Sequence, residues 1–306
     1  MIEAFGRVFL AAIILLFPLL LPMKAFSAGA VKFRHVMSVY NDDKGIELKK
    51  PEGVACGDES LFIVADTGNS RLLRFTFWDK DLAMDAEINV PQLTNPIRVE
   101  VNSRGEIYAL NGRDRRIVHL SREGEFKGYL EPVGLPSTSS YVPRGFDIDN
   151  NDNIYILDIF SERVLILNPD GEYKQQINFP ENYGFFSDIS VDFKNNIILI
   201  DSINAKAFTA TLNSKSFSPF TESLKEHMRF PTSLTTDKRG RIFLVDQNGS
   251  RIVILGQDGS YLGQMSDMGW KDGLLNYPSQ ICINNKGNIF IADVNNQRVQ
   301  IFSIIK

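Results

Sequence analysis

The chain is poor in the residues from which enzymes most often build catalytic and metal sites. Its 306 residues include three histidines and two cysteines. His35, His119 and His227 do not fall on positions that we expect to share a site. Zinc sites depend mainly on histidine and cysteine, so a zinc-histidine mechanism is not expected. The nucleophile and phosphate motifs G-x-S-x-G, H-E-x-x-H and the Gly-rich loop are also absent.

The chain also lacks an excess of basic residues. It holds 33 Lys and Arg against 37 Asp and Glu, which gives a formal charge of -4. Proteins that bind nucleic acid usually carry a basic face, and an acidic surface repels phosphate backbones. We therefore expect no nucleic acid among the partners of this protein.

The longest apolar run lies near the N-terminus, from Val8 to Leu21. Arg7 precedes this run and the small residues Ala28-Gly29-Ala30 follow it, which is the order of a secretory signal. We predict a signal peptide over residues 1–30 and a single domain over 31–306, in the periplasm or secreted. An uncleaved membrane anchor is the alternative, although a span needs about 20 apolar residues. The membrane would be a partner only in that case.

One segment recurs six times between residue 50 and the C-terminus. Each copy has an apolar run that ends in an anchor residue, and a cation follows five positions later. The anchors are spaced by 44, 48, 43, 45 and 47 residues, a period typical of one propeller blade. The six pairs are Asp66/Arg71, Leu110/Arg115, Asp158/Arg163, Asp201/Lys206, Asp246/Arg251 and Asp293/Arg298.

Each copy predicts four short antiparallel strands. In the third copy, β-rich segments at 143–149, 153–158, 163–167 and 172–177 are separated by Asn, Asp, Gly and Pro. The segment before each anchor is apolar nearly throughout, as expected for a strand buried on both faces between stacked blades. We therefore predict an all-β fold, a six-bladed β-propeller of four-stranded antiparallel blades.

The two ends of the chain are expected to meet. The sixth copy has three strands, and residues 32–40 form a strand-like segment that belongs to no copy. Pairing of this segment with the outer edge of the last blade would cover that edge. We therefore predict that an N-terminal strand completes the last blade and closes the ring.

Cys56 and Cys282 occupy nearly equivalent strands of the first and last copies. Cys56 lies five residues after Pro51, whereas Cys282 lies four residues after Pro278, so their side chains face opposite ways. Two buried free thiols are the expectation. A disulfide is the alternative, since ring closure would make the two copies neighbours.

Several copies resemble the NHL repeat. The resemblance covers about residues 50–306, is strong in copies one, three, five and six, and is weakest in copy four, where Phe185-Phe186 replaces the usual proline. It implies a six-bladed propeller used mainly as a binding platform. The motifs are Pro51-Glu-Gly-Val, Phe62-Ile-Val-Ala-Asp66, Thr67-Gly-Asn-Ser-Arg71, Gly287-Asn-Ile-Phe-Ile-Ala-Asp293 and Asn296-Gln-Arg298.

The repeated acid and cation pairs are expected to be structural. An acid at the end of a buried strand can accept backbone N–H groups, and the cation would bracket the loop that follows. Six copies of one pair cannot all be one active site. The second copy carries Leu110 at the anchor position, so the repeat tolerates loss of the acid.

Positions that break the sixfold symmetry are candidates for a binding site. On the innermost strand, alternation places the second and fourth residues after the proline next to the axis. Four of these residues are charged, namely Arg98, Glu100, Asp147 and Asp188. They predict a ligand or divalent-cation site at the channel mouth or, as we favour, a water-filled channel with paired charges.

The loops of one rim are the second candidate site. Loops that enter the innermost strands and loops that follow the anchors should share a rim, where a partner would bind. Arg116 is expected to mark an exposed strand edge, because most equivalent positions are apolar. The candidate contact residues are Arg113, Asp114, Arg144, Phe160, Asn204, Asn248, Asn295 and Asn296.

Together these features favour an exported binding or scaffold propeller without a cofactor. Its polar rim would face a protein or a glycan of the cell envelope. The alternative is a calcium-dependent lactone hydrolase or lyase, since some propellers with related repeats hold a metal on the axis. Glu100, Asp147 and Asp188 would then be the metal ligands, because calcium prefers several oxygen atoms.

Overall fold

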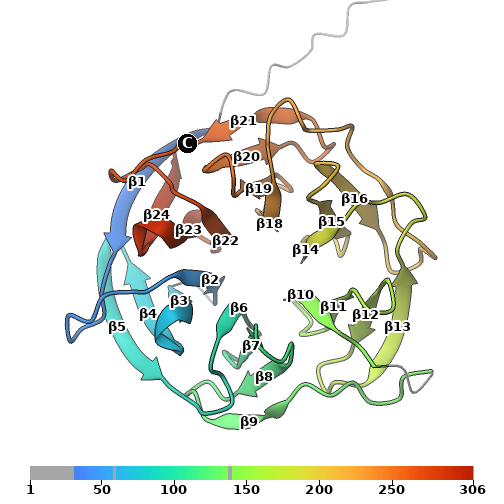
Figure 1. Cartoon of the computed structure of the whole chain (residues 1–306), viewed down its shortest axis with the longest axis horizontal. Coiled ribbons are helices and arrows are strands. Elements are labelled where there is room, and N and C mark those ends of the chain that lie inside the picture. The colour runs from blue at the N-terminus through green and yellow to red at the C-terminus, as the bar shows by residue number, and fades with distance from the viewer. Residues whose placement is uncertain (1–30, 58–59, 137–139, 306) are drawn as a thin grey trace, which may run out of the picture.

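The computed structural model describes residues 31–57, 60–136 and 140–305, and its strands form a ring (Figure 1). Six four-stranded antiparallel sheets surround a central axis, so the predicted six-bladed β-propeller is confirmed. The predicted signal peptide, residues 1–30, lies outside the described residues. Within the described residues, no helix is long and apolar enough to cross a membrane.

In blades 1 to 5 the strands follow chain order from the axis to the outside of the ring, and in blade 6 the outermost strand is the N-terminal strand β1. Blades 1 and 2 consist of β2 (Pro51–Cys56), β3 (Leu61–Asp66), β4 (Arg71–Trp78), β5 (Asp81–Ile88), β6 (Pro96–Val101), β7 (Ile107–Asn111), β8 (Ile117–Leu120) and β9 (Phe126–Tyr129). Blades 3 and 4 consist of β10 (Pro143–Ile148), β11 (Ile154–Asp158), β12 (Arg163–Leu167), β13 (Tyr173–Asn178), β14 (Phe186–Val191), β15 (Ile197–Asp201), β16 (Lys206–Ala210) and β17 (Ser218–Pro219). Blades 5 and 6 consist of β18 (Pro231–Thr236), β19 (Ile242–Asp246), β20 (Arg251–Leu255), β21 (Tyr261–Met265), β22 (Pro278–Ile283), β23 (Asn288–Asp293), β24 (Arg298–Ile305) and β1 (Lys32–Val39). Two 3-10 turns, η1 (Thr67–Asn69) and η2 (Val294–Asn296), follow anchors.

The N-terminal strand closes the ring. β1 pairs antiparallel with β24, from Lys32 opposite Ile305 to Val39 opposite Val299, and the two strands lie side by side in Figure 1. The sheet order β1-β24-β23-β22 confirms the predicted closure. This pairing hides the outer edge of β24, which would otherwise be open to pairing with another chain.

The core lies between neighbouring blades. Every residue of β11, β15 and β19 is buried, as expected for strands covered on both faces. Between blades 1 and 6, the rings of Phe62 and Phe290 lie 4.6 Å apart, and Phe75 stacks on Phe62 at 5.0 Å. Each blade is thus stabilised mainly by apolar contact with the next blade.

The cysteine expectation was wrong. Cys56, at the end of β2, and Cys282, in β22, form a disulfide with a Cα–Cα distance of 5.7 Å. Their side chains do face opposite ways within their own repeats. Because blades 1 and 6 are neighbours in the closed ring, opposite faces are the ones that meet.

The second repeat was misaligned by one residue. Asn111 pairs with Pro96 as Asp66 pairs with Pro51, so Asn111 is the anchor in place of Leu110. The cation five positions later is then Arg116 in place of Arg115. Arg116 is therefore a repeat residue; its side chain is 43% exposed, with Nη2 2.8 Å from Glu131 Oε1.

Candidate functional site

Each anchor residue binds the loop that enters the inner strand and also begins the loop that follows the anchor. Both kinds of loop lie on one face of the ring, which we call the anchor face. In blade 1, Asp66 Oδ1 accepts the backbone N–H of Lys49 at 2.7 Å, and Arg71 Nε donates to Asp66 Oδ2 at 2.8 Å. The amide oxygen of Asn111 accepts the backbone N–H of Asn95 at 3.0 Å in the same way. The loop that enters the inner strand is thus fixed to the loop that follows the anchor.

Other blades vary this arrangement. The acid and cation atoms lie 3.0 Å apart in Asp158/Arg163, 3.5 Å in Asp246/Arg251 and 2.8 Å in Asp293/Arg298. In blade 4, Asp201 makes no ion pair with Lys206 among the described residues, and it accepts backbone N–H bonds from Gly184 and Phe185 at 2.7 and 3.0 Å. Burial alone would raise the pKa of Asp201, but these N–H donors outweigh it and lower the pKa.

The four charged residues predicted to line the axis do come together at the hub. From β6, Arg98 Nη1 reaches Asp188 on β14, and Arg98 Nη2 lies 3.2 Å from Glu100 Oε1. Arg98 Nε also donates to the carbonyl of Phe146 on β10 at 3.0 Å. Gly145 has no side chain and so leaves room for the Arg98–Asp188 contact, since a Cβ there would lie 3.1 Å from Asp188 Oδ1. Burial alone would lower the pKa of Arg98, but the charges of Asp188 and Glu100 raise it.

Gln280 of β22 belongs to the same cluster, although it was not among the predicted site residues. Its Nε2 donates to Glu100 Oε1 at 2.9 Å, and its Oε1 accepts the backbone N–H of Val54 at 3.2 Å. Its position two residues after Pro278 was the available signal. Hereafter Arg98, Glu100, Asp147, Asp188 and Gln280 are called the hub cluster.

The two aspartates of the hub cluster bind backbone groups of the next inner strand. Asp147 Oδ2 accepts the N–H of Val191 at 2.7 Å, and Asp188 Oδ2 accepts the N–H of Leu234 at 3.0 Å. Burial raises the pKa of Asp147 to about 6 despite these bonds. Burial also raises the pKa of Glu100 well above its usual range.

The raised pKa of Asp147 predicts a pH-dependent contribution to stability. The folded protein binds a proton at about pH 6, whereas the unfolded chain binds it at 3.8. The Asp147 contribution to the free energy of unfolding is therefore fully present below pH 4 and is lost as the pH rises through 6, by about 3 kcal/mol at most.

Urea unfolding between pH 4 and 7 checks this prediction. We expect the stability of Asp147→Asn relative to the wild type to rise across this range. The exposed control Asp43→Asn should keep a constant difference from the wild type. A constant difference for Asp147→Asn as well would contradict the prediction.

The carboxylates of the hub are not arranged as a metal site. Within the described part of the chain, no group of three or more His, Cys, Asp and Glu residues is placed to hold a metal ion. Arg98 already pairs with Asp188 and Glu100, and Asp147 accepts two backbone N–H bonds at 2.8 and 2.7 Å. A calcium ion would have to displace these cationic and N–H partners.

A cavity of about 400 Å³ opens at the anchor-face end of the channel, and we call it the mouth pocket. All six blades contribute to it, and Arg98 and Gln280 of the hub cluster also line it. The pocket includes Glu52 from β2, Arg144 from β10 and Ser233 from β18. The sequence predicted Arg98 at a channel-mouth site and Arg144 on the rim, and both residues line this cavity.

The predicted rim residues divide into two groups. Arg113, Asp114, Phe160, Asn248 and Asn295 are exposed on the anchor face. Asn204 and Asn296 are partly buried, and each donates its amide to an anchor, Asp201 at 2.8 Å and Asp293 at 2.9 Å. Arg144 is also partly buried, with its guanidinium 5.1 Å from the centre of the Phe185 ring.

Large apolar side chains are also exposed on the anchor face. Phe160 is 64% exposed and Trp270 is 79% exposed. The loop of Trp270 is fixed to this face because Gly269 O accepts the side-chain amide of Asn296, next to an anchor. The sequence prediction missed all of them except Phe160, since an apolar loop residue is more often packed than exposed. We call this set the apolar rim: Tyr40, Ile46, Ile159, Phe160, Ile203, Met268, Trp270 and Tyr277.

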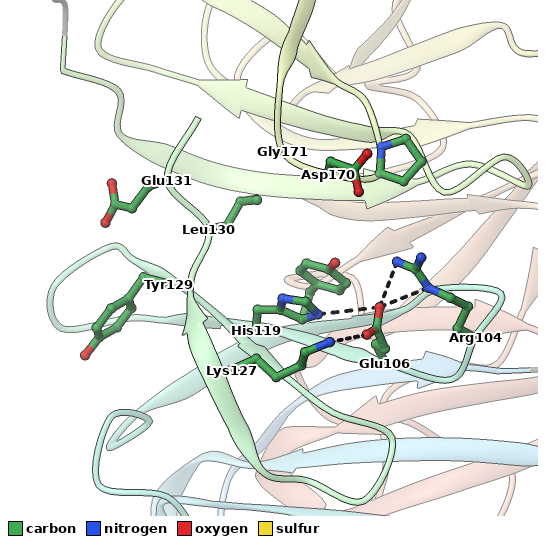
Figure 2. A pocket seen from close by; sticks show the side chains of 11 residues that line it. Arg104, Glu106, His119, Lys127, Tyr129, Leu130, Glu131, Asp170 and Gly171 are labelled. Atoms are coloured by element: carbon green, nitrogen blue, oxygen red, sulfur yellow. Dashed lines mark hydrogen bonds and ion pairs between the residues drawn. The ribbon is translucent and has the colours of Figure 1, made fainter. Parts of the chain in front are cut away.

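A second cavity, of about 450 Å³, lies between blades 2 and 3 (Figure 2). Figure 2 shows interactions converging on Glu106, with Lys127 Nζ at 2.6 Å and Arg104 Nη2 at 2.9 Å. His119 stacks on Tyr108 with ring centres 4.3 Å apart. Burial alone would raise the pKa of Glu106, but Lys127 and its other partners lower it to about 2. Three of its charged groups, Arg104, Glu106 and Lys127, already pair with one another.

The C-terminal part of the ring matches a known repeat. Residues 275–302, which include Pro278, Asp293 and Arg298, match the model of the NHL repeat. The propeller contains an NHL repeat. The predicted resemblance is therefore confirmed, and the NHL repeat spans the loop before β22 and most of blade 6.

Solved structures share the fold at low sequence identity. Virginiamycin B lyase from Staphylococcus aureus is 14% identical, with a TM-score of 0.60 over 90% of this chain and 100% of that one. A gluconolactonase from Xanthomonas campestris is 11% identical, with a TM-score of 0.66 over 90% of each chain. An auxiliary nutrient binding protein from Bacteroides thetaiotaomicron is 12% identical, with a TM-score of 0.65 over 90% of this chain and 77% of that one. These similarities establish the fold alone, and no curated protein sequence matches the chain.

Proposed function

We propose that this NHL-repeat propeller is an exported binding protein that docks a protein of the cell envelope on its anchor face. The observation that carries the proposal is the apolar rim. Eight large apolar side chains are exposed on that face, between 37% and 79% of their full exposure. Aromatic residues and Met are enriched in protein interfaces, whereas charged residues are depleted at their cores.

The rigidity of the loops supports docking. Each anchor binds two loops, so the apolar rim is fixed before a partner arrives, and little loop entropy is lost on binding. Around Trp270, the loop is held by Asn296 and by two carbonyl contacts to the guanidinium of Arg298, at 2.9 and 2.8 Å. A rim built on such loops provides a rigid surface.

The disulfide supports the proposed location outside the cytoplasm. A disulfide persists in an oxidising compartment, and Cys56–Cys282 joins the first and last blades. Together with the signal-like residues 1–30, it favours the periplasm or the medium as the site of function.

A glycan partner and a calcium-dependent lyase or hydrolase are weaker candidates. Glycan sites place aromatic rings beside polar groups that bind hydroxyls, whereas the apolar rim also holds Ile46, Ile159, Ile203 and Met268. The enzyme would need free carboxylates, and those of the hub cluster are paired. The lyase and gluconolactonase among the solved structures are 11–14% identical, which carries no catalytic residue over to this chain.

Paired charge substitutions on the two faces of the ring test the proposal. We expect Phe160→Glu/Trp270→Glu to reduce recovery of a partner from the envelope fraction at least tenfold, since charge is excluded from an interface core. The matched control Phe193→Glu/Leu212→Glu changes two exposed residues in turns of the opposite face and should retain the partner. Equal recovery by both variants, or recovery of glycan alone, would count against protein docking on the anchor face.

A further inference from the structure

The mouth pocket contains buried polar atoms that have no partner among the described residues. Ser233 is 2% exposed, yet its hydroxyl makes no hydrogen bond. The hydroxyl of Thr232 and Nη1 of Arg115 are also buried without a partner. All three residues line this one cavity. Buried polar groups in folded proteins are nearly always hydrogen-bonded, so unpartnered groups that converge on a cavity are available to bind a ligand there.

The pocket also holds two arginines outside the hub cluster. Arg115 follows the anchor of blade 2, and Arg144 lies on the inner strand of blade 3. Neither forms an ion pair within the described ranges, in contrast to Arg98, which pairs with Asp188. Burial, together with the nearby charge of Arg115, lowers the pKa of Arg144. Two adjacent unpaired guanidinium groups favour an anion, which Arg binds with two parallel hydrogen bonds.

One acid limits the kind of anion. Glu52, on blade 1, also lines the pocket, and its carboxylate has no partner within the described ranges. Burial raises the pKa of Glu52. A carboxylate at this place accepts hydroxyl groups and repels a multiply charged phosphate. The volume of about 400 Å³ lies within the range of small-molecule sites, roughly 300–1,000 Å³.

We propose that the mouth pocket binds a small polyhydroxylated carboxylate of the hexuronate class. Its carboxylate lies between Arg115 and Arg144, and its hydroxyls bind Ser233, Thr232 and Glu52. Arg98 and Gln280 end the pocket toward the hub, so the ligand enters from the anchor face. This site goes beyond docking on the apolar rim and requires no partner protein.

Calorimetric titration of the isolated protein tests the proposal. Glucuronate and galacturonate serve as probes, with methyl glucoside as the neutral sugar and inorganic phosphate as the simple anion. We expect saturable binding of a uronate, at least tenfold tighter than that of methyl glucoside or phosphate. Arg115→Gln and Arg144→Gln should each weaken uronate binding about tenfold, and Ser233→Ala about threefold. The matched control Arg239→Gln changes an exposed arginine in a turn of the opposite face and should alter binding less than twofold.

Several results would overturn the uronate site. They are no saturable binding of either uronate below about 10 mM, equal binding of methyl glucoside or of phosphate, or an equal loss in Arg239→Gln and Arg144→Gln. Ser233→Ala removes a single oxygen atom. If an arginine variant does not fold, the loss of uronate binding can still be measured with Ser233→Ala. Phe160→Glu/Trp270→Glu should bind uronate normally, so failure of rim docking and failure of the pocket are separately observed.

Discussion

Replacing Arg98 with alanine is expected to lower the free energy of unfolding by about 3–5 kcal/mol, the usual cost of leaving a buried ion without its partner. Asp188 is fully buried and would lose its cationic partner. The variant also lacks the hydrogen bond from Arg98 to the carbonyl of Phe146, and it leaves empty the space beside Gly145 that the guanidinium fills. Three blades would thus lose their common contact.

Urea unfolding at pH 7 measures this effect. The double variant Arg98→Met/Asp188→Asn removes both charges and should recover at least half of the lost stability, since well-packed neutral groups often replace a buried ion pair. Arg239→Ala, on the exposed turn between β18 and β19, should change stability by less than about 0.5 kcal/mol. A loss below about 1 kcal/mol in Arg98→Ala would mean that solvent compensates Asp188.

Removal of the disulfide is expected to have an effect of similar size. Cys56 and Cys282 are separated by 226 residues, and closing so long a loop restricts the unfolded chain by about 5 kcal/mol on the chain-entropy model. The double variant Cys56→Ala/Cys282→Ala should therefore unfold at a lower urea concentration. It should still close the ring, because β1 remains paired with β24.

Reductant supplies the control for the disulfide prediction. Adding dithiothreitol should shift the wild type to the stability of the double variant and should leave the double variant unchanged. If the wild type is insensitive to reductant after full reduction of both thiols, the loop-closure account of its stability is wrong.

Periodicity is the reason that the fold was predictable. The interval between repeats indicated that one copy is one blade, and the six copies predicted six blades. The alternation of the inner strand placed Arg98, Glu100, Asp147 and Asp188 around the axis. Repeat interval and strand alternation can both be read from the sequence without knowing which distant segments are in contact. The error at the second repeat arose because Leu110 ends an apolar run, whereas register depends on backbone pairing, which puts Asn111 opposite Pro96.

The disulfide and the pocket depend on contacts between distant blades. Alternation gives the direction of Cys56 and Cys282 but says nothing of the distance between their strands, which ring closure sets. Likewise, whether Ser233 has a partner depends on every group around it. The sequence of β18 shows a serine beside the axis, while its lack of a hydrogen bond is a property of the assembled ring.

The pairing of β1 with β24 has a consequence for how the protein is made. Lys32–Val39 leaves the ribosome first, and Arg298–Ile305, its partner, follows more than 250 residues later. A chain interrupted before β24 therefore carries an unpaired strand, β1, and an open edge on β23, which remains paired with β22 on its other side. Such strands and edges are open to proteases and to aggregation. These edges are hidden only when β24 is present, so truncated chains remain distinguishable from full-length ones.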